Sequence, residues 1–324
     1  MRRFQRTAEL LLKHCADVQP DESVLIVVDD YARPIAMGQV VADIAKDIGA
    51  NTVMMITSPQ LIAGQEVLPP TGAAMQHADC IIAINEKQGI AHTNARKEAS
   101  AKGARLYTFN LEHGEDHFDR AISLEDLELL RDRAIRLTEI FNQGDQVHIT
   151  TCLGTDLRFS LAGRIGMAVQ PFAKRFAAWP DFAKATISPV EGTGEGTLVV
   201  DAFIIGWNYL FREPLRYTIR QGRVVGVQGP HAEVQRVREI LSRDEGASNC
   251  PCQFSMGVSH TVDAVRRGSR WESGKIGLAE IACGRNNDIG GTTFSKIHFD
   301  NLFTQTTVLL DGGLLMENGE WCWE

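Results

Sequence analysis

A histidine and an aspartate two residues apart form the pattern with the clearest chemical potential in this chain. His298 and Asp300 lie in the β-like run Ile297-His298-Phe299-Asp300, and Glu280 precedes them in the strand-like stretch Leu278-Ala279-Glu280-Ile281-Ala282. Residues i and i+2 of a strand face the same side, so the imidazole and the carboxylate can present ligand atoms to one point. This is half of a metal site, and Glu280 would supply a third, hard ligand. The alternative is a partly exposed strand with a solvated polar face.

The elements around these residues predict how they are brought together. Between the two stretches lies Gly284-Arg285-Asn286-Asn287-Asp288-Ile289-Gly290-Gly291, which can turn the chain back. After Gly144 the sequence alternates β-like stretches with Gly-rich turns, and one helix is expected from Ala232 to Leu241. The other predicted strands of this half are residues 146–152, 155–161, 196–205, 215–220, 222–228 and 306–310.

The first half has a different sequence pattern, in which predicted helices alternate with unbroken hydrophobic strands. Helices are predicted over residues 8–16, 34–48 and 94–102, and strands over 23–29, 51–56, 80–84 and 105–109. Continuous apolar strands between helices are typical of a parallel sheet that is covered on both faces. The predicted fold class is therefore α/β, with a doubly wound parallel-sheet domain over residues 1–143 and a β-rich α+β domain over residues 144–324 that carries the metal and the catalysis.

The composition of the chain indicates which classes of binding partner can be excluded. The chain has 324 residues, of which 44% are hydrophobic and 23% charged, and its formal net charge is −8. This charge argues against nucleic-acid or anionic-membrane binding, and no apolar run approaches the length of a membrane span. Met1 to Arg6 leads into an amphipathic helix without a secretory signal, so we expect a cytoplasmic protein. Its seven scattered cysteines do not suggest a disulfide framework.

A glycine-rich segment precedes a predicted strand, and its sequence is Pro189-Val190-Glu191-Gly192-Thr193-Gly194-Glu195-Gly196-Thr197. It resembles the signature of the aminopeptidase T, or thermophilic metalloaminopeptidase, superfamily. The other matching segments are Glu213-Pro214-Leu215-Arg216, Gly222-Arg223-Val224-Val225, the turn 284–291, His298-x-Asp300, Asp311-Gly312, His92 to Ala99 and Gly103-Ala104-Arg105. The superfamily includes a mononuclear-iron branch, the 2,5-dihydroxypyridine 5,6-dioxygenases, whose length is closer to that of this chain. The resemblance implies an α/β N-terminal domain, a metal-carrying C-terminal domain and homo-oligomeric assembly.

The chain departs from the superfamily pattern at several positions, and these differences indicate which branch it resembles. Two glutamates precede the His and Asp ligands of the peptidases, and the resemblance aligns them with Lys184 and Gln253. A cationic lysine cannot ligate a divalent metal and a neutral glutamine is a poor ligand, so a dinuclear site is not expected. A further peptidase histidine aligns with Glu280, which keeps the capacity to bind a metal. The dioxygenases keep one earlier histidine, which also aligns with Gln253, and His260 could compensate for it.

The resemblance favours a mononuclear metalloenzyme that cleaves the ring of a hydroxylated pyridine or a similar N-heterocycle. Fe(II) is the favoured cofactor, because three ligands on one face (His298, Asp300 and either Glu280 or His260) leave adjacent positions for an ortho-hydroxylated aromatic and O₂. The alternative is a Zn- or Mn-dependent aminopeptidase or amide hydrolase, in which Glu280 is a ligand or the general base. A third possibility is a metal-free binding protein on the same scaffold. Each predicts a small-molecule partner.

Further residues are candidates for substrate contacts, and each has a structural alternative. Lys184 and Gln253 are expected to face the substrate from the positions of the lost ligands. Trp207 could line an aromatic pocket or belong to the core, and Arg212 could pair with a substrate carboxylate or be a surface charge. His92 either belongs to the cap region of the helix that Thr93 or Asn94 begins, or reaches the substrate as a catalytic residue from the carboxyl end of a strand.

Overall fold

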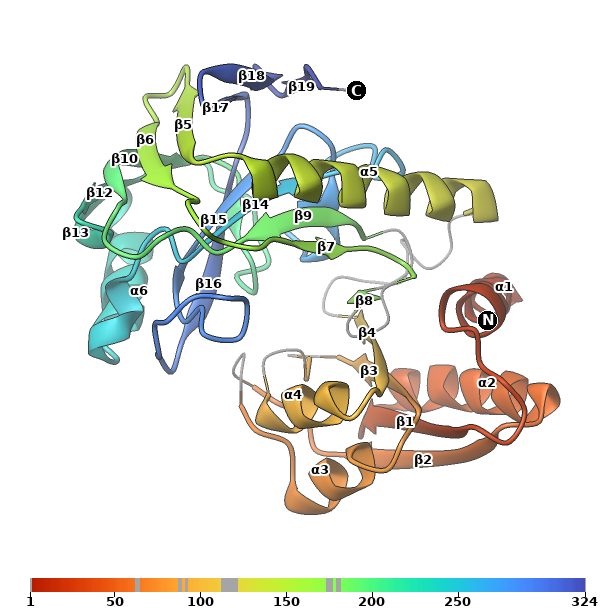
Figure 1. Cartoon of the computed structure of the whole chain (residues 1–324). Helices are drawn as coiled ribbons and strands as arrows, with labels where there is room; N and C mark the ends of the chain where they lie inside the picture. The colour runs from red at the N-terminus through yellow and green to blue at the C-terminus, as the bar shows by residue number, and fades with distance from the viewer. Residues whose placement is uncertain are drawn as a thin grey trace. The chain divides into compact units, whose positions relative to one another are not determined.

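The computed structural model describes residues 2–61, 65–86, 89–90, 93–111, 122–172, 177–178 and 182–323 (Figure 1). They belong to two compact units: unit 1 comprises Met1–Arg131 and Val169–Phe182, and unit 2 comprises Asp132–Ala168 and Ala183–Glu324. This division differs from the predicted boundary at residues 143/144 in two places. It falls within the long helix α5 (Leu124–Gln143), and it returns residues 169–182 to unit 1, because the short strand β8 (Ala177–Ala178) pairs with β4 (Arg105–Asn110).

Unit 1 is built on a parallel sheet with the strand order β2-β1-β3-β4-β8. Its remaining strands are β1 (Ser23–Asp29), β2 (Asn51–Thr57) and β3 (Cys80–Asn85). The helices are α1 (Arg2–Leu10), which continues as a π-helical turn over Leu11–Cys15, α2 (Ala32–Ile48), α3 (Pro69–Met75) and α4 (Asn94–Ala101). The predicted helices and strands of this half are all present, and α3 is an addition.

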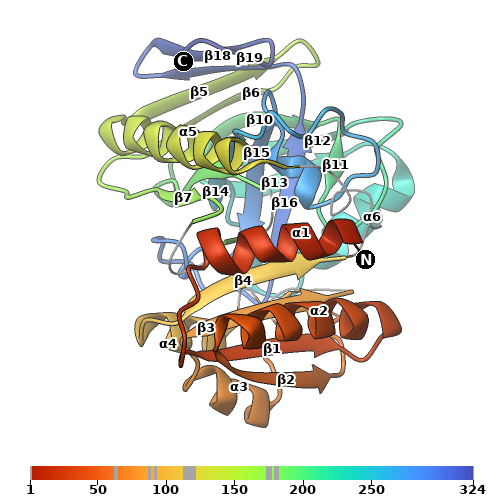
Figure 2. The ribbon, with the colours of Figure 1, turned by 90° about the vertical axis from the view of Figure 1, so that its right-hand side faces the viewer.

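Alternate residues of β1 supply two separate cores. Val24, Ile26 and Val28 pack in one cluster with residues of α1 and α2, whereas Leu25 and Val27 pack in another with residues of α3 and α4. Figure 2 shows α2 and α3 on opposite faces of the sheet. A strand buried on both faces must be apolar at every position, which is the pattern that the sequence has here. The predicted doubly wound parallel sheet is confirmed.

Unit 2 contains two β-sheets. The eight-stranded sheet has the order β13-β12-β10-β6-β5-β17-β18-β19, and the six-stranded sheet has the order β11-β16-β15-β14-β9-β7. The strands are β5 (Gln146–Thr151), β6 (Asp156–Ser160), β7 (Met167–Val169), β9 (Lys184–Ile187), β10 (Glu195–Val200), β11 (Phe203–Ile204), β12 (Leu215–Arg220), β13 (Arg223–Gln228), β14 (Gln253–Gly257), β15 (Ala279–Gly284), β16 (His298–Phe303), β17 (Thr306–Leu310), β18 (Gly313–Glu317) and β19 (Glu320–Trp321). The helix α6 (His231–Leu241) and two short 3₁₀ turns, Glu245–Ser248 and Trp271–Gly274, complete the unit. The β-rich α+β character predicted for this half is confirmed.

One predicted strand is wrong. Residues 196–205 were expected to form a single strand, but they divide into β10 in the eight-stranded sheet and β11 in the six-stranded sheet. Asp201 marks the break, because its carboxylate accepts hydrogen bonds from the backbone nitrogen and the hydroxyl of Thr304 (2.9 and 2.5 Å). Ile204 then pairs with Asn301 of β16. The long-range contact of Asp201 therefore overrides the local β propensity of the apolar residues on either side of it.

The face of the six-stranded sheet that carries Phe254 forms the core of unit 2. The Phe254 ring lies 5.1 Å from the ring of Phe141 on α5 and 5.5 Å from the ring of Phe159 on β6, measured between centroids. All three side chains are buried. These contacts join the six-stranded sheet to the helix and to the other sheet, so the opposite face is the one available for chemistry.

Candidate functional site

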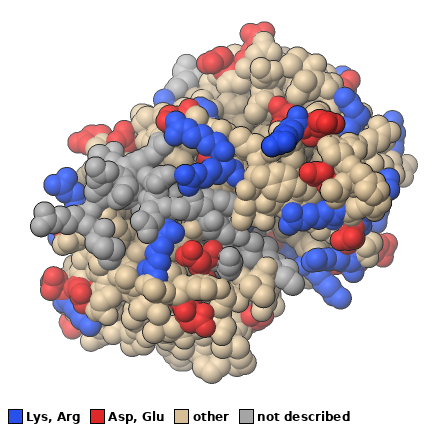
Figure 3. Space-filling model, turned by 180° about the vertical axis from the view of Figure 1, so that it is seen from behind, with Lys and Arg blue, Asp and Glu red and all other residues tan. Residues whose placement is uncertain are grey.

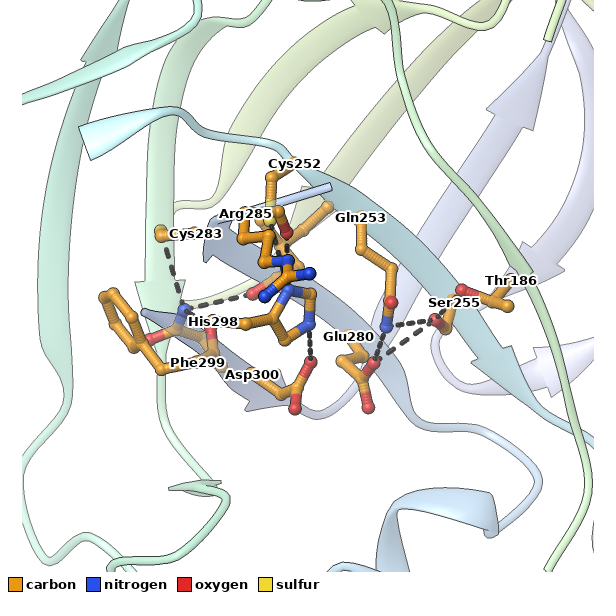
Figure 4. A network of polar contacts seen from close by, with 12 residues as sticks. Thr186, Cys252, Gln253, Ser255, Glu280, Cys283, Arg285, His298, Phe299 and Asp300 are labelled. Atoms are coloured by element: carbon orange, nitrogen blue, oxygen red, sulfur yellow. Dashed lines mark hydrogen bonds and ion pairs between the residues drawn. The ribbon is translucent and has the colours of Figure 1, made fainter. Parts of the chain in front are cut away.

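Polar side chains from four adjacent strands lie on one face of the six-stranded sheet. The antiparallel register pairs Ser255 with Thr186 on one side and with Glu280 on the other. Directly paired residues of antiparallel strands project to the same face, and so do residues i and i+2 of one strand. We call this set the polar face, and it consists of Lys184 and Thr186 on β9, Gln253 and Ser255 on β14, Glu280 on β15, and His298 and Asp300 on β16. Figure 4 shows Thr186, Gln253, Ser255, Glu280, His298 and Asp300 of this face.

Small residues of β15 leave room beside the two predicted metal ligands. Asp300 pairs with Ala282, and His298 pairs with Gly284. The turn predicted over residues 284–291 joins β15 to β16, so the predicted adjacency of Glu280 and the His-x-Asp pair is confirmed at the level of the strands. The spacing in the sequence was therefore sufficient to predict that Glu280 and the His-x-Asp pair lie on neighbouring strands.

His298 is held by both of its ring nitrogens. Nδ1 lies 2.7 Å from the backbone oxygen of Arg285, and since a carbonyl oxygen can only accept, Nδ1 carries a proton. Nε2 lies 3.1 Å from Asp300 Oδ1, and the two side chains are 6% and 7% exposed. Burial opposes protonation of the imidazole, but the Asp300 carboxylate outweighs it, so the pKa of His298 is raised well above its ordinary value.

The thiol of Cys252 is a further neighbour of this imidazole, with its sulfur 3.8 Å from His298 Nδ1. Burial raises the pKa of Cys252 to about 11, against the opposing effect of His298. Burial therefore favours the protonated thiol. Cys252 was not among the predicted site residues, because its closeness to His298 depends on the pairing of three strands.

Asp300 is ionised. Burial alone would raise the pKa of its carboxyl group, but the charge and hydrogen bond of His298, and then the charge of Lys184, hold the pKa well below the usual range of an aspartate. A buried carboxylate in this state needs a cation at all times, either a protonated imidazole or a metal ion. In this structure the cation is the protonated imidazole of His298.

Glu280 forms a buried ion pair with Lys184. Lys184 Nζ lies 2.7 Å from Glu280 Oε1, and the side chains are 10% and 2% exposed. Burial raises the pKa of Glu280, although Lys184 acts in the opposite direction. Among the described residues, the second carboxylate oxygen, Oε2, is buried without a hydrogen-bond partner. Glu280 therefore keeps one buried oxygen that is available to another group.

Three uncharged side chains surround this ion pair. Gln253 Nε2 donates to Glu280 Oε1 (2.5 Å) and to Ser255 Oγ (3.1 Å), and Ser255 Oγ lies 2.8 Å from Thr186 Oγ1. Since a carboxylate oxygen can only accept, the amide nitrogen of Gln253 is the atom that faces Glu280. Ser255 and Thr186 were not predicted, nor were β9 and β14. Their signal was the alternation of polar residues with Phe254, Met256, Ala185 and Ile187, which is the period of a strand.

The donor chemistry of the His298–Asp300 pair fits a divalent metal. Imidazole nitrogen and carboxylate oxygen are ligand types that Fe, Zn and Mn accept, and in this structure His298 Nε2 and Asp300 Oδ1 form a hydrogen-bonded ion pair at 3.1 Å. The unpartnered Oε2 of Glu280 is a further candidate donor. Within the described ranges, however, no three His, Cys, Asp or Glu side chains form a group that could hold a metal ion. The structure thus brings two of the three predicted ligands together, and the role of Glu280 as a metal ligand stays a prediction.

The remaining predicted site residues lie elsewhere. His260 is exposed in a bend after Ser259, so it does not complete a three-residue metal group with His298 and Asp300. His92 lies outside the described residues, and Thr93 caps α4 by accepting a hydrogen bond from the Arg96 nitrogen (3.2 Å).

Trp207 and Arg212 lie in the segment between β11 and β12. Trp207 is 7% exposed, and its ring packs against Tyr209 and Phe211 while the Arg236 guanidinium stacks at 4.3 Å. This favours the core alternative for Trp207. Arg212 is exposed and lines an open cavity of about 480 Å³ together with Tyr209, Leu210, Phe211, Glu213, Pro230 and Glu233.

The charge on one face of the molecule is mixed. Figure 3 shows basic and acidic side chains interspersed over the face in view, with uncharged surface between them. None of the helices in the described part of the chain is long and apolar enough to cross a membrane.

Comparison with known proteins places this site in context. The family model described as 2,5-dihydroxypyridine 5,6-dioxygenase matches residues 4–276. The matched range contains Lys184, Gln253 and His260 and ends before Glu280, His298 and Asp300. No curated protein sequence matches the chain.

Two solved structures share the fold over almost the whole chain. The 2,5-dihydroxypyridine dioxygenase from Pseudomonas putida KT2440 superimposes with a TM-score of 0.84 at 17% identity, covering 99% of this chain and 97% of that one. AmpT from Thermus thermophilus superimposes with a TM-score of 0.74 at 14% identity, covering 99% of both chains. The family match confirms the dioxygenase branch of the resemblance stated from the sequence motifs, and the two solved structures share the fold.

Proposed function

The chain belongs to the 2,5-dihydroxypyridine 5,6-dioxygenase family, and from this premise we propose that it is a ring-cleaving dioxygenase with one divalent metal, Fe(II) being favoured. The proposed substrate is a compact hydroxylated pyridine or a similar N-heterocycle. The observation that carries the proposal is the buried His298–Asp300 pair, whose facing nitrogen and oxygen are 3.1 Å apart. His298 Nε2 and Asp300 would hold the metal, with Glu280 Oε2 as the candidate third ligand.

The hydrogen bonds of His298 support this assignment. Because Nδ1 donates its proton to the Arg285 carbonyl, Nε2 is the nitrogen left to bind a cation. Metal-bound histidines usually donate their other ring N–H to a carbonyl or carboxylate, which fixes the ring and its tautomer. When bound, the metal would supply adjacent open positions at which the hydroxylated ring and O₂ come together.

The other residues of the polar face would act on the substrate by charge and hydrogen bonding. Lys184 places a fixed positive charge in the electrostatic environment of Asp300, so an anionic ring oxygen is favoured there. Both described hydrogen bonds of Gln253 use its nitrogen, so the amide oxygen is the atom that it can offer to a ring N–H or hydroxyl donor. Lys184 also occupies a cation position beside Glu280, so the proposal includes one metal per subunit and no second one.

A second candidate is a metal-dependent amide hydrolase, and Glu280 is the observation that favours it. Its pKa is raised by burial and its Oε2 lacks a partner among the described residues, which are properties of a general base. In this alternative Glu280 would take a proton from an attacking water. The dioxygenase is preferred because the family match names that activity.

Metal analysis and oxygen dependence test the proposal together. Protein purified without added metal is expected to bind one Fe(II) per subunit and to consume O₂ with 2,5-dihydroxypyridine or a related hydroxypyridine as the probe. His298→Ala should weaken metal binding more than about 100-fold, since even outer partners of metal ligands cost about 10–100-fold. His231→Ala, which changes an exposed histidine at the start of α6, is the matched control.

Several outcomes would contradict the proposal. Full metal occupancy in His298→Ala would remove the metal site, and two stoichiometric metals in the wild-type protein would remove the role given to Lys184. Anaerobic release of amino acids from dipeptides, supported by Zn²⁺ or Mn²⁺, would favour the hydrolase. Absence of metal binding together with tight binding of the hydroxypyridine would favour a binding protein.

A further inference from the structure

Two glycine-rich segments of the sequence signature meet in the structure. Glu191, from the segment 189–197, accepts hydrogen bonds at Oε1 from Asn286 Nδ2 (2.8 Å) and from the Thr292 nitrogen (2.7 Å). Both partners lie on the loop 285–297, which joins β15 to β16. The signature segment therefore anchors the loop that leads into His298.

Arg164 adds a second anchor to the same loop. It forms an ion pair with Glu191 Oε2, and its Nη1 donates to the backbone oxygen of Gly290 (2.7 Å). The side chains of Arg164 and Glu191 are 15% and 21% exposed, so the pair is shielded from most solvent screening. Burial would raise the pKa of Glu191, but the Thr292 N–H and the other partners lower it, so the carboxylate is ionised at neutral pH.

Asn286 organises the inside of the loop. It is fully buried, its Nδ2 also donates to Ser188 Oγ (2.9 Å), and its Oδ1 accepts from the Thr293 nitrogen (2.8 Å). Its backbone oxygen accepts from the Gly291 nitrogen (2.9 Å). A Cβ at Gly291 would lie 2.1 Å from Asn286 Cγ, so a side chain cannot fit at that position. Asn286 is thus held at every polar atom of its side chain.

The peptide that precedes Asn286 is the one that contacts the site. The backbone oxygen of Arg285 accepts from His298 Nδ1 at 2.7 Å, and the Arg285 nitrogen donates to the Ile297 oxygen at 2.8 Å. Gly284 has a φ of 105°, and a Cβ there would lie 2.4 Å from the Ile297 oxygen. The strand can turn here because residue 284 is glycine. The carbonyl that fixes the His298 ring therefore lies between the end of β15 and the anchored loop.

We propose that Glu191 is a positioning residue for His298. It acts through Asn286 and the Arg285 carbonyl, which receives the Nδ1 proton and directs Nε2 toward Asp300. The contact between Glu191 and the loop does not depend on a metal, whereas its consequence for metal affinity rests on the proposed function. This gives the signature segment 189–197 a role in the site, although none of its residues belongs to the polar face.

The exchange of the His298 ring proton tests this inference. Metal-free protein with ¹⁵N-labelled histidine rings is expected to show a slowly exchanging Nδ1–H signal that is absent from His298→Asn. Glu191→Ala should speed that exchange at least about tenfold at constant pH, because the hydrogen bond to Arg285 opens more often. Glu191→Gln keeps an oxygen for Asn286 and Thr292 but loses the charge facing Arg164, so it should give an intermediate rate.

Asp201→Ala is the matched control. Asp201 is half-buried and, like Glu191, ties distant parts of the chain through two hydrogen bonds, at Thr304. Its loss should leave the His298 proton exchange unchanged, although stability falls. If Asp201→Ala speeds the exchange as much as Glu191→Ala does, the effect is general loosening and the inference fails.

Two further arms separate the inference from the proposed function. Titration with Mn²⁺ alone should show about 10–100-fold weaker binding in Glu191→Ala than in the wild type. If Mn²⁺ does not bind the wild type but Glu191→Ala still speeds the exchange, the positioning role stands and the proposed function fails. Unchanged exchange in Glu191→Ala overturns the inference. If that variant does not fold, Arg164→Met provides the same test through the Gly290 anchor.

Discussion

The two faces of the six-stranded sheet are made by the same strands, yet they differ in how their side chains are stabilised. On one face Phe254, Met256 and Ile281 pack in a core, and on the other Thr186, Ser255 and Glu280 are also 2% exposed or less. Burial therefore does not distinguish the faces. The difference lies in the polar face, where nearly every charge is balanced by a neighbour, and it shows that a strand with a period of two can serve packing and chemistry at once.

The largest effect on stability is expected on the apolar face. Phe254→Ala should lower the free energy of unfolding by about 3–5 kcal/mol, because it removes a fully buried ring and leaves a cavity beside Phe141 and Phe159. Chemical denaturation monitored by circular dichroism measures the change. Phe294→Ala is the control, since Phe294 is 77% exposed and its loss should change stability by no more than about 0.5 kcal/mol. Equal effects of the two substitutions would show that this face is not the core.

A smaller effect is expected from breaking the charge balance of the polar face. Lys184→Met leaves the Glu280 carboxylate buried without its cation, which typically costs about 3–5 kcal/mol. We expect a loss below this range, because burial already raises the pKa of Glu280 and uptake of a proton relieves the charge. The double variant Lys184→Met/Glu280→Gln should recover most of the stability, because glutamine retains an acceptor for Gln253. If the stability losses of Lys184→Met and of Glu280→Gln simply add in the double variant, this result would argue against the ion pair.

The smallest of the three effects is a pH dependence that is confined to the polar face. The pKa of His298 is raised in the folded protein, so its contribution to stability is complete below its ordinary value of about 6.5 and is lost as the pH rises through the folded pKa. The Tm of the metal-free protein should therefore fall with rising pH relative to His298→Asn, by roughly 2–4 °C for each kcal/mol lost. Phe254→Ala should keep the wild-type slope.

Added metal should reverse this pH dependence. A divalent ion binds the neutral imidazole, so metal-induced stabilisation should grow as the pH rises. Thermal unfolding with and without Mn²⁺ between pH 6 and pH 9 compares the two trends. Identical slopes for the wild type and His298→Asn without metal would contradict the assignment of the proton to the His298–Asp300 pair.

Much of the fold was predictable because local patterns determine it. The unbroken apolar strands of unit 1 predicted a parallel sheet covered on both faces, and the confirmed helices α2, α4 and α6 follow from amphipathic or capped segments. The His-x-Asp spacing predicted that His298 and Asp300 share a face, since that follows from the two-residue period of a strand. The motifs were also sufficient to predict the family.

The rest of the site depends on contacts between residues distant in the sequence. Lys184 and Glu280 are 96 positions apart, and their ion pair exists because β9, β14 and β15 are neighbours in one sheet. The same is true of Glu191, whose anchor on the loop before His298 could not be read from its glycine-rich surroundings. Residue types and local periods are properties of the sequence. Which carboxylate pairs with which cation depends on the assembled sheet, because strand order and register set those distances and no local propensity encodes them.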